Sequence, residues 1–444
     1  MVVRPGLWGH PGLDPGFMGG GSGVPDSTRQ HRPSRSAGRF VRPDANYRRS
    51  HTFGPGRPVK PLHTFGDNHR VTTPNANPSF APSELTQRIH QAIAQAGGWL
   101  GFDRFMAMAL YEPGLGYYTN DLQKFGAMPA SGSDFVTAPG MSPLFGQTLA
   151  VQVQQALEVT GTDEVWEFGA GTGALALQLL DSLGDAVRRY TIIDLSGTLR
   201  ARQAETLRKY AGKVRWLEAW PDAIEGVVVG NEVLDAMPVQ LLQRTQGVWH
   251  ERGVVTVVGM EGVDFAWQDR PTDLRPPLEI EGAHDYLTEI HPQAEAFVAS
   301  LAERLKAGRG GAAFFLDYGF PEGEYFHPQR HMGTVMCHQL HQADDNPLLS
   351  VGQKDITAHV NFTGVALAAQ NAELEVLGYA SQAWFLLNLG LADRMAAATL
   401  AERSQAQRLV NEHEMGELFK VIGFATSADW SAQGFARGDR SHRL

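Results

Sequence analysis

Cysteine and long apolar runs are scarce in this chain of 444 residues. The single cysteine, Cys337, excludes an internal disulfide and is typical of a protein from a reducing compartment. The apolar stretches, such as residues 312–316, have the length of a strand, whereas a helix that crosses a bilayer needs about 20 apolar residues. With 43% apolar and 19% charged residues, the composition is that of an ordinary soluble protein, and we expect no membrane insertion.

Acidic residues are scarce in the first 80 residues and abundant in the rest of the chain. Residues 1–80 contain ten Arg and one Lys against four Asp, a charge of +7, whereas the remainder has 27 basic and 44 acidic residues, a charge of −17. The first segment is also rich in Gly, Pro and His, repeats His-Thr-Phe-Gly from His51 and from His63, and shows neither helical nor strand periodicity. We therefore predict a disordered basic extension over residues 1–80.

The extension and the charge pattern also bear on compartment and partners. The extension lacks both the amphipathic helical face of a transit peptide and the apolar core of a secretory signal. We expect a cytoplasmic protein if the source is bacterial, and a protein of the mitochondrial matrix if it is eukaryotic. The acidic body argues against nucleic acid as the main partner, because phosphate binding needs a basic face, and it suits a basic segment of another protein.

Strands and helices alternate between residues 163 and 235, which predicts a Rossmann-like α/β core with a parallel sheet. The predicted strands span 163–168, 189–194, 214–217 and 227–229, and the predicted helices span 173–183 and 197–210. Residues 81–160 precede this core, with helices expected at 84–96, 102–109 and 142–158 around a Gly/Pro-rich segment. Ser83 is the expected N-cap of the first helix. The loop of this segment is rich in Tyr, Phe, Asp and Thr, and loops of this composition often line binding sites.

A β-rich segment interrupts the alternation over residues 240–290, and we interpret it as an insertion between two parts of the core, 161–239 and 291–444. The α/β rhythm then resumes. The later elements are predicted as helices at 291–306 and 363–371, strands at 312–317 and 374–379, and two helices between about 388 and 412.

The loop between the first predicted strand and its helix carries three alternate glycines, Gly169, Gly171 and Gly173. Glycine allows a tight turn and a close approach of the backbone to a ligand, and the free N–H groups of the following helix point at that ligand. Asp194 ends the next strand, where an acidic residue binds ribose hydroxyls in nucleotide-binding folds. The pattern predicts a cofactor site.

Two cofactors fit this loop. Gly169, Gly171 and Ala174 match the relaxed fingerprint of dinucleotide binding, which indicates NAD. Glu167, two residues before the first glycine, favours S-adenosylmethionine (SAM) instead, because its carboxylate would repel a pyrophosphate and attract a sulfonium and an ammonium group. We predict SAM and keep NAD as the alternative.

A second polar cluster, Asn231, Glu232 and Asp235, follows the strand at 227–229. Residues just past the carboxyl end of a strand face the ligand crevice of an open α/β sheet, so these three are our candidate catalytic residues beside the methyl donor. Two carboxylates could orient a planar, protonated guanidinium, which indicates arginine as the methyl acceptor. The alternative is that Asn231 and Asp235 merely cap the following turn and helix.

Several other polar or aromatic residues have weaker assignments. The segment with His327, His331, Cys337, His338, His341, Asp344 and Asp345 lacks a paired Cys-x-x-Cys, so we predict no metal there. The dipeptide Asp317-Tyr318 ends a buried strand and could close the site from the far side. Trp216 and Trp220 follow the third strand and could pack against an adenine ring or in the core.

Taken together, the motifs resemble those of the MidA family of class I SAM-dependent methyltransferases, from about residue 83 to the end of the chain. The N-terminal matches are 110–113 (Leu-Tyr-Glu-Pro), 116–118 (Gly-Tyr-Tyr), 134–139 (Asp-Phe-Val-Thr-Ala-Pro), 142–146 (Ser-Pro-Leu-Phe-Gly) and the loop at 167–173. The later matches are 231–239 (Asn-Glu-Val-Leu-Asp-Ala-Met-Pro-Val), 316–319 (Leu-Asp-Tyr-Gly), the run at 337–341, 355–362 (Asp-Ile-Thr-Ala-His-Val-Asn-Phe) and 415–420 (Met-Gly-Glu-Leu-Phe-Lys).

The resemblance implies a class I methyltransferase fold in which the elements containing Tyr117 and Asp134 close over SAM. It also implies methyl transfer to an arginine of a protein, since the family includes a mitochondrial protein arginine methyltransferase that assists the assembly of respiratory complex I. A subunit of that complex is the implied partner. The alternatives are a non-catalytic assembly factor that binds SAM, and a methyltransferase for a small molecule or for another protein residue.

Overall fold

The computed structural model describes residues 83–120, 136–259, 262–427 and 429–444, which all belong to one compact unit. The predicted basic extension and Asp134 lie outside the described residues. Among the helices of the described segments, none is long and apolar enough to cross a membrane.

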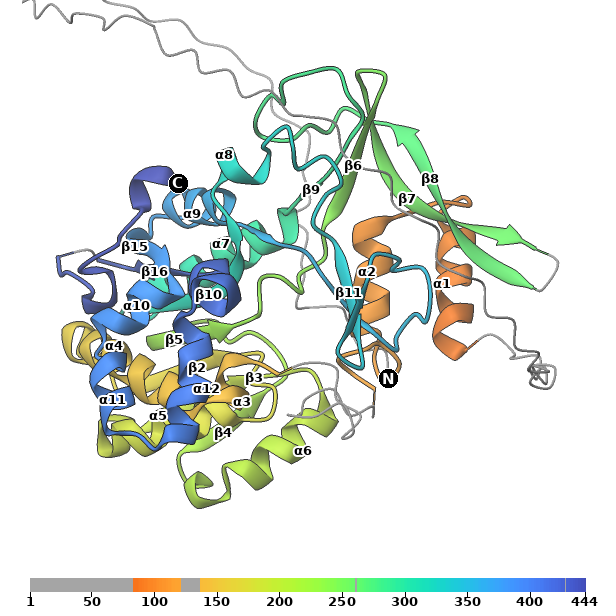
Figure 1. The fold of residues 1–444 in the computed structure, drawn as a ribbon. Coiled ribbons are helices and arrows are strands. Elements are labelled where there is room, and N and C mark those ends of the chain that lie inside the picture. The colour runs from red at the N-terminus through yellow and green to blue at the C-terminus, as the bar shows by residue number, and fades with distance from the viewer. Residues whose placement is uncertain (1–82, 121–135, 260–261, 428) are drawn as a thin grey trace, which may run out of the picture. The chain divides into compact units, whose positions relative to one another are not determined.

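The central sheet has the strand order β15-β16-β10-β5-β2-β3-β4, shown in Figure 1. These strands are β15 (Glu375–Ser381), β16 (Phe419–Ala425), β10 (Gly311–Phe320), β5 (Gly226–Asn231), β2 (Glu164–Phe168), β3 (Arg189–Ile193) and β4 (Val214–Leu217), and the short β14 (Val360–Asn361) pairs with β10. The ladders between β4 and β10 are parallel, whereas β16 runs antiparallel to both of its neighbours. The predicted Rossmann-like α/β core is confirmed.

Strand β16 was not predicted, and it makes the sheet mixed rather than parallel. Its sequence, Phe-Lys-Val-Ile-Gly-Phe-Ala, contains a lysine and a glycine, both of which weaken a strand signal. Lys420 is nevertheless buried, and a hydrogen bond from its Nζ to the carbonyl of Leu418, at 3.3 Å, offsets part of the cost of burying the charge. Gly423 leaves room for the rings of Phe435 and Phe314, because a Cβ at this position would lie only 2.7 Å from the first ring and 3.1 Å from the second.

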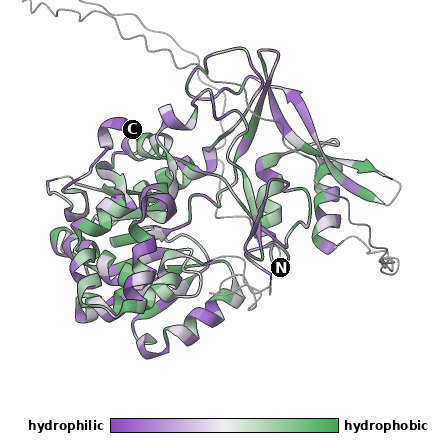
Figure 2. Ribbon diagram, in the orientation of Figure 1, coloured by the Kyte–Doolittle hydropathy of each residue, from purple (hydrophilic) through white to green (hydrophobic). Residues whose placement is uncertain are grey.

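Helices cover both faces of the central sheet, and alternate strand residues supply the two cores. Phe314 of β10 packs with α4 (Pro143–Thr160), α5 (Ala174–Leu183), α10 (Gln382–Asn388) and α12 (Leu400–Val410), whereas Phe315 packs on the other face with α7 (Pro292–Ala307) and α9 (Phe362–Asn371). Figure 2 shows the apolar residues gathered along these central strands. Four further helices of this part of the chain are α3 (Ala138–Met141), α6 (Gly197–Thr206), α8 (Glu322–Tyr325) and α11 (Leu391–Ala397).

One predicted helix ends earlier than expected, and an additional helix precedes the last predicted pair. The helix predicted at 197–210 stops at Thr206 in α6, and a 3-10 turn follows it. The two helices expected between about 388 and 412 are α11 and α12, whereas α10, which precedes them, was not predicted. Gly390, in a left-handed conformation (φ 88°), separates α10 from α11, and Thr399 starts α12 with a capping box.

The β-rich segment forms an antiparallel sheet with the order β1-β7-β6-β9, in which β8 also pairs with β7. Its strands are β1 (Leu100–Gly101), β6 (Gln240–Thr245), β7 (Val248–Val258), β8 (Val263–Pro271) and β9 (Tyr286–Ile290). Helices α1 (Glu84–Gln95) and α2 (Phe102–Tyr111) bury their apolar faces in the same core cluster as Val254 of β7. Ser83 caps α1 as expected, since its hydroxyl accepts from the N–H of Thr86 at 3.1 Å.

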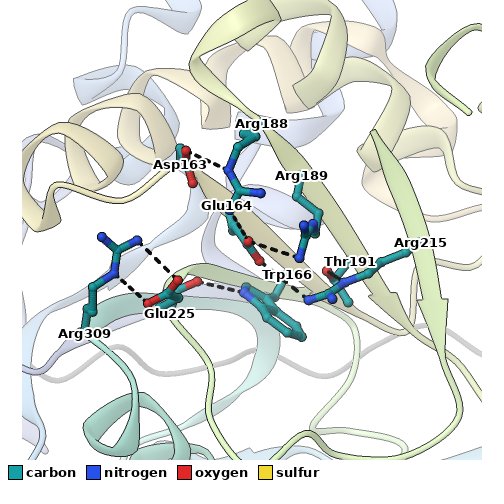
Figure 3. Close-up of polar contacts among 9 residues, drawn as sticks. All are labelled: Asp163, Glu164, Trp166, Arg188, Arg189, Thr191, Arg215, Glu225 and Arg309. Carbon is teal, nitrogen blue, oxygen red and sulfur yellow. Dashed lines mark hydrogen bonds and ion pairs between the residues drawn. The ribbon is translucent and has the colours of Figure 1, made fainter. Parts of the chain in front are cut away.

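An ion-pair network ties the amino ends of β2 and β3 together, at the edge of the sheet opposite the glycine loop (Figure 3). Glu164, the first residue of β2, is buried, and its carboxylate lies 2.5 Å from Arg188, 3.5 Å from Arg189 and 3.6 Å from Arg215. The Arg215 guanidinium also lies over the ring of Trp166. Because the arginines are partly exposed, solvent screens their charges. The buried carboxylate of Glu164 nevertheless needs these arginines to satisfy its charge.

We predict that Glu164→Gln lowers the free energy of unfolding by about 1–3 kcal/mol, because a neutral amide cannot satisfy three guanidinium groups. Urea unfolding measures the loss, and SAM affinity, measured by titration calorimetry, should stay unchanged since the network lies away from the loop. Glu205→Gln is the control, because the Glu205–Arg208 pair is exposed and should contribute little. Equal stability of the two variants would contradict the prediction.

Candidate functional site

The glycine loop joins β2 to α5 in a backbone conformation that other residues avoid. Gly169, Gly171 and Gly173 have φ values of 63°, 53° and 80°, all in the left-handed region. A Cβ on Gly169 would also lie 3.1 Å from Val233, so the loop passes close to the neighbouring strand end. The N–H groups at the start of α5 therefore face a space that the chain leaves open.

That space is a cavity of about 500 Å³ at the carboxyl ends of β2, β3, β5 and β10. Its lining includes five carboxylates, and among the described residues that line it there is no lysine or arginine. The five are Glu167, Asp194, Glu232, Asp235 and Asp355. A pyrophosphate would meet only repulsion from these groups, whereas a sulfonium, an ammonium or a guanidinium would be attracted. The lining therefore favours SAM over NAD.

Glu167 is buried at the end of β2 and has one neutral hydrogen-bond partner. Its Oε2 accepts from the hydroxyl of Tyr190 at 2.6 Å. Burial raises the pKa of Glu167 to about 8, the Tyr190 hydrogen bond lowers it, and the negative charge of Asp194 raises it. The carboxyl group is thus poised to ionise when a cation enters.

Asp194 lines the cavity just past the end of β3. Its Oδ1 accepts from the N–H of Ser196 at 2.9 Å, and its Oδ2 accepts from the side-chain amide of Gln203 at 2.7 Å. Of the two tryptophans considered from the sequence, Trp220 lines the cavity, whereas the indole N–H of Trp216 donates to Gln203 at 2.9 Å. Gln203 carries no motif that would have identified it in the sequence.

The cluster after β5 adopts a strained turn. Glu232 has a φ of 55°, which is uncommon for a residue other than glycine and is found at functional sites. Asp317 of the neighbouring strand β10 stabilises the turn, since its Oδ2 accepts from the N–H groups of Val233 and Leu234 at 3.0 Å and 2.8 Å. Asp317 therefore holds the turn rather than closing the cavity, while its neighbour Tyr318 lines the cavity.

The polar atoms of this turn leave hydrogen-bonding capacity for a ligand. The amide of Asn231 donates to Glu232 Oε1 at 2.9 Å. Within the described part of the chain, Asn231 Oδ1 and Asp235 Oδ1 are buried without a hydrogen-bond partner. Burial and the charge of Asp235 raise the pKa of Glu232 to about 8, and burial raises that of Asp235 to about 6. Such groups accept hydrogen bonds from a cationic ligand.

A small sheet, which was not predicted, forms another wall of the cavity. It has the order β12-β11-β13, with β11 (Met336–Gln339), β12 (Gln342–Asp344) and β13 (Asp355–Thr357). Alternate residues line the cavity, and those between them pack in the core of α1 and α2. The lining residues are Met336, His338, Asp355 and Thr357, and the core residues are Cys337 and Ile356. In the sequence, this segment was considered only as a metal site and as one of the matches to the family.

The N-terminal segment lines the cavity with the neighbours of Tyr117, the residue predicted from the sequence, and not with Tyr117 itself. Tyr117 is fully buried in the apolar core of α1 and α2, and the neighbouring Tyr118 and Thr119 line the cavity instead. The Tyr118 hydroxyl donates to Asp355 Oδ1 at 2.8 Å, which joins the N-terminal segment to the small sheet. The choice between adjacent tyrosines depends on how the turn packs, which a motif does not encode.

The histidine-rich segment does not form a cluster of metal ligands. No group of three or more His, Cys, Asp or Glu side chains in the described ranges is arranged to hold a metal ion. Burial raises the pKa of the Cys337 thiol to about 12, which keeps it protonated in the core.

Comparisons with known proteins agree with this geometry. A family model described as an S-adenosyl-L-methionine-dependent methyltransferase matches residues 148–380. A protein from Burkholderia thailandensis, solved with bound S-adenosyl-homocysteine, is 48% identical over 81% of this chain and 96% of that chain, with a TM-score of 0.75. "Protein arginine methyltransferase NDUFAF7, mitochondrial" is 27% identical in Danio rerio, over 79% of this chain and 90% of that protein. Its Homo sapiens counterpart is 26% identical over 72% and 78%. The cofactor is SAM.

We predict that SAM affinity gains from the ionisation of Glu167. A bound cation favours the carboxylate, so binding below pH 8 should release a proton, and the contribution of Glu167 to affinity should grow as pH rises through its pKa of about 8. Titration calorimetry in buffers of different ionisation heat measures the release. Glu167→Gln should abolish this component, and the amine of SAM titrates equally with both variants. The same proton release in both would refute the role.

Proposed function

We propose that this chain, which belongs to the MidA family of class I SAM-dependent methyltransferases, transfers methyl groups to arginine side chains of a protein. The observation that carries the proposal is the pair of buried, unpartnered oxygens of Asn231 and Asp235 in a cavity lined by carboxylates and, among described residues, by no lysine or arginine. The names of its relatives in several animals support arginine as the acceptor.

The cofactor half of the cavity would hold SAM through the residues at the ends of β2 and β3. The glycine loop would approach the methionine part, with Glu167 near its cationic groups, and Asp194 would bind the ribose hydroxyls. Asp134, which was assigned to this half from the family resemblance, remains a proposal. Bound SAM supplies an electrophilic methyl group and leaves as S-adenosylhomocysteine.

The acceptor half would hold a guanidinium between Glu232 and Asp235. Two carboxylates can accept its planar N–H groups and turn one nitrogen toward the methyl group. As the new N–C bond forms and the S–C bond breaks, the guanidinium must lose one proton, and Glu232, with a pKa of about 8, can accept it at Oε2. Asn231 would align Glu232 through their hydrogen bond. Positioning then supplies most of the rate acceleration.

A protein acceptor fits the charge of the chain. The body outside the first 80 residues carries −17, with 27 basic and 44 acidic residues, and attracts basic segments of a partner. Following the family resemblance, we propose a subunit of respiratory complex I as that partner, in the bacterial cytoplasm or the mitochondrial matrix according to the source. A non-catalytic SAM-binding factor would bind SAM equally well, so only a turnover measurement separates it from the enzyme.

We predict that Glu232→Gln and Asp235→Asn each lower kcat/KM for an arginine peptide by about a hundredfold or more, because a charge-assisted contact to the acceptor is lost. SAM affinity should change little, since both residues lie in the acceptor half. Transfer of labelled methyl groups from SAM to arginine and lysine peptides, with mass-spectrometric assignment, measures the effect. Glu205→Gln is again the exposed control.

The outcomes separate the candidate functions. Methylation of arginine peptides alone supports the proposal, and methylation of lysine peptides alone assigns a different protein residue. Unchanged turnover in both variants would remove Glu232 and Asp235 from the acceptor site. SAM binding without transfer to any peptide or to proteins of a complex I preparation would favour the non-catalytic factor.

A further inference from the structure

Gln203 is a fully buried polar residue of α6 that does not line the cavity and has no role in the proposed reaction. Its side chain lies between the glycine loop and the carboxylate of Asp194. Its Nε2 donates to Asp194 Oδ2 at 2.7 Å and to the carbonyl of Gly171 at 3.0 Å. One amide nitrogen thus connects two parts of the cofactor site that are far apart in sequence.

The orientation of this amide is set by its other end. Gln203 Oε1 accepts from the indole N–H of Trp216 at 2.9 Å. An indole nitrogen is only a donor, so it must meet the oxygen of the amide, and the NH₂ group must then face Asp194 and Gly171. Trp216 therefore prevents the flip that would turn an amide oxygen toward the Asp194 carboxylate.

Helix α6 contacts the loop at two successive carbonyls. One turn after Gln203, the hydroxyl of Thr206 donates to the carbonyl of Thr172 at 2.9 Å. The helix also approaches closely at Gly173, where a Cβ would lie 3.4 Å from the Cα of Gln203. Loop and helix therefore hold one relative position, in which both oxygens of Asp194 have a donor.

We propose that Gln203 is a positioning residue for SAM, which fixes the Asp194 carboxylate toward the ribose hydroxyls and holds the glycine loop at the same time. Its neutral amide donates two hydrogen bonds and adds no charge, so Asp194 stays an acceptor for the ribose. The inference rests on the assignment of Asp194 to the ribose and is independent of the methyl acceptor.

Gln203→Glu tests the inference, because it preserves shape and the acceptor for Trp216 but replaces the two donated bonds by a carboxyl group. That group would lie within hydrogen-bonding distance of Asp194. Two such carboxyls retain one shared proton at moderately acid pH and repel each other once both ionise. A protonated carboxyl can still donate to Asp194, whereas an ionised one cannot.

We therefore expect the affinity of Gln203→Glu for SAM to approach that of the unmodified protein at pH 6 and to fall about ten- to a hundredfold below it at pH 8.5. Titration calorimetry of the full chain gives both values. The other titratable or charged groups are Glu167 and Tyr111, which face Asp194, and on α6 Arg200, which pairs with Glu218, Arg202, and Glu205, which pairs with Arg208. They are the same in both proteins, and the ionisation of Glu167 changes affinity in the opposite direction.

Gln152→Glu is the matched control. Gln152 is also fully buried and bridges two partners, since it donates to Gln155 at 3.0 Å and accepts from the N–H of Gly434 at 2.8 Å. This variant should lose thermal stability without a new pH dependence of SAM affinity. Gln203→Leu should lose affinity equally at both pH values, because it has no group to titrate.

Two results would overturn the proposal. One is SAM affinity of Gln203→Glu equal to that of the unmodified protein at pH 8.5, and the other is the same loss at pH 6 and pH 8.5, which indicates a general structural effect. If Gln203→Glu does not fold, the SAM affinities of Trp216→Phe and Gln203→Leu test the proposal instead. Both must weaken SAM binding, and unchanged affinity in either would refute the role of the amide.

Discussion

The accumulation of carboxylates in one cavity is the constraint on which the rest of the structure depends. Parallel strands end at a common edge, so the acids that follow β2, β3 and β5 meet there. Burial makes each charge costly and neighbouring carboxylates repel one another, which is why the pKa values of Glu167 and Glu232 both rise to about 8. Two apolar cores on either side of the sheet stabilise the scaffold that holds these groups together. Bound SAM, a cation, relieves the repulsion between the carboxylates, and the guanidinium acceptor proposed above would do the same.

The two ends of β2 show how the surroundings, and not the residue type, decide what a buried acid does. Glu164 and Glu167 lie three residues apart in one strand and are both buried. At the amino end, three arginines surround Glu164, and the fold itself satisfies the charge. At the carboxyl end, Glu167 has the neutral hydroxyl of Tyr190 and the like charge of Asp194 nearby. Glu164 therefore links the ends of neighbouring strands, whereas Glu167 remains available to interact with a ligand.

Residues outside the lining of the cavity hold residues that line it. Asp317 gathers the N–H groups of the turn that carries Glu232 and Asp235, and we infer that Gln203 does the equivalent work between Asp194 and the glycine loop. Asp317 lies on β10, which pairs with β5, and Gln203 lies on α6, which packs against the glycine loop. Small errors in position reduce methyl transfer strongly, because the reaction depends on alignment more than on acid–base chemistry. The supports are therefore as much a part of the site as its lining.

The sequence by itself determined the α/β core, the glycine loop and the acids at the strand ends, because these depend on local periodicity and on turns that only glycine adopts readily. It also predicted SAM over NAD from the sign of one charge, Glu167. The tertiary structure alone decided that β16 enters the sheet antiparallel, that Tyr118 rather than Tyr117 lines the cavity, and that Asp355 meets Tyr118 across 237 positions of sequence. Gln203 likewise became visible only in the fold. Such contacts arise from the packing of distant segments, and neither spacing nor composition carries a record of them.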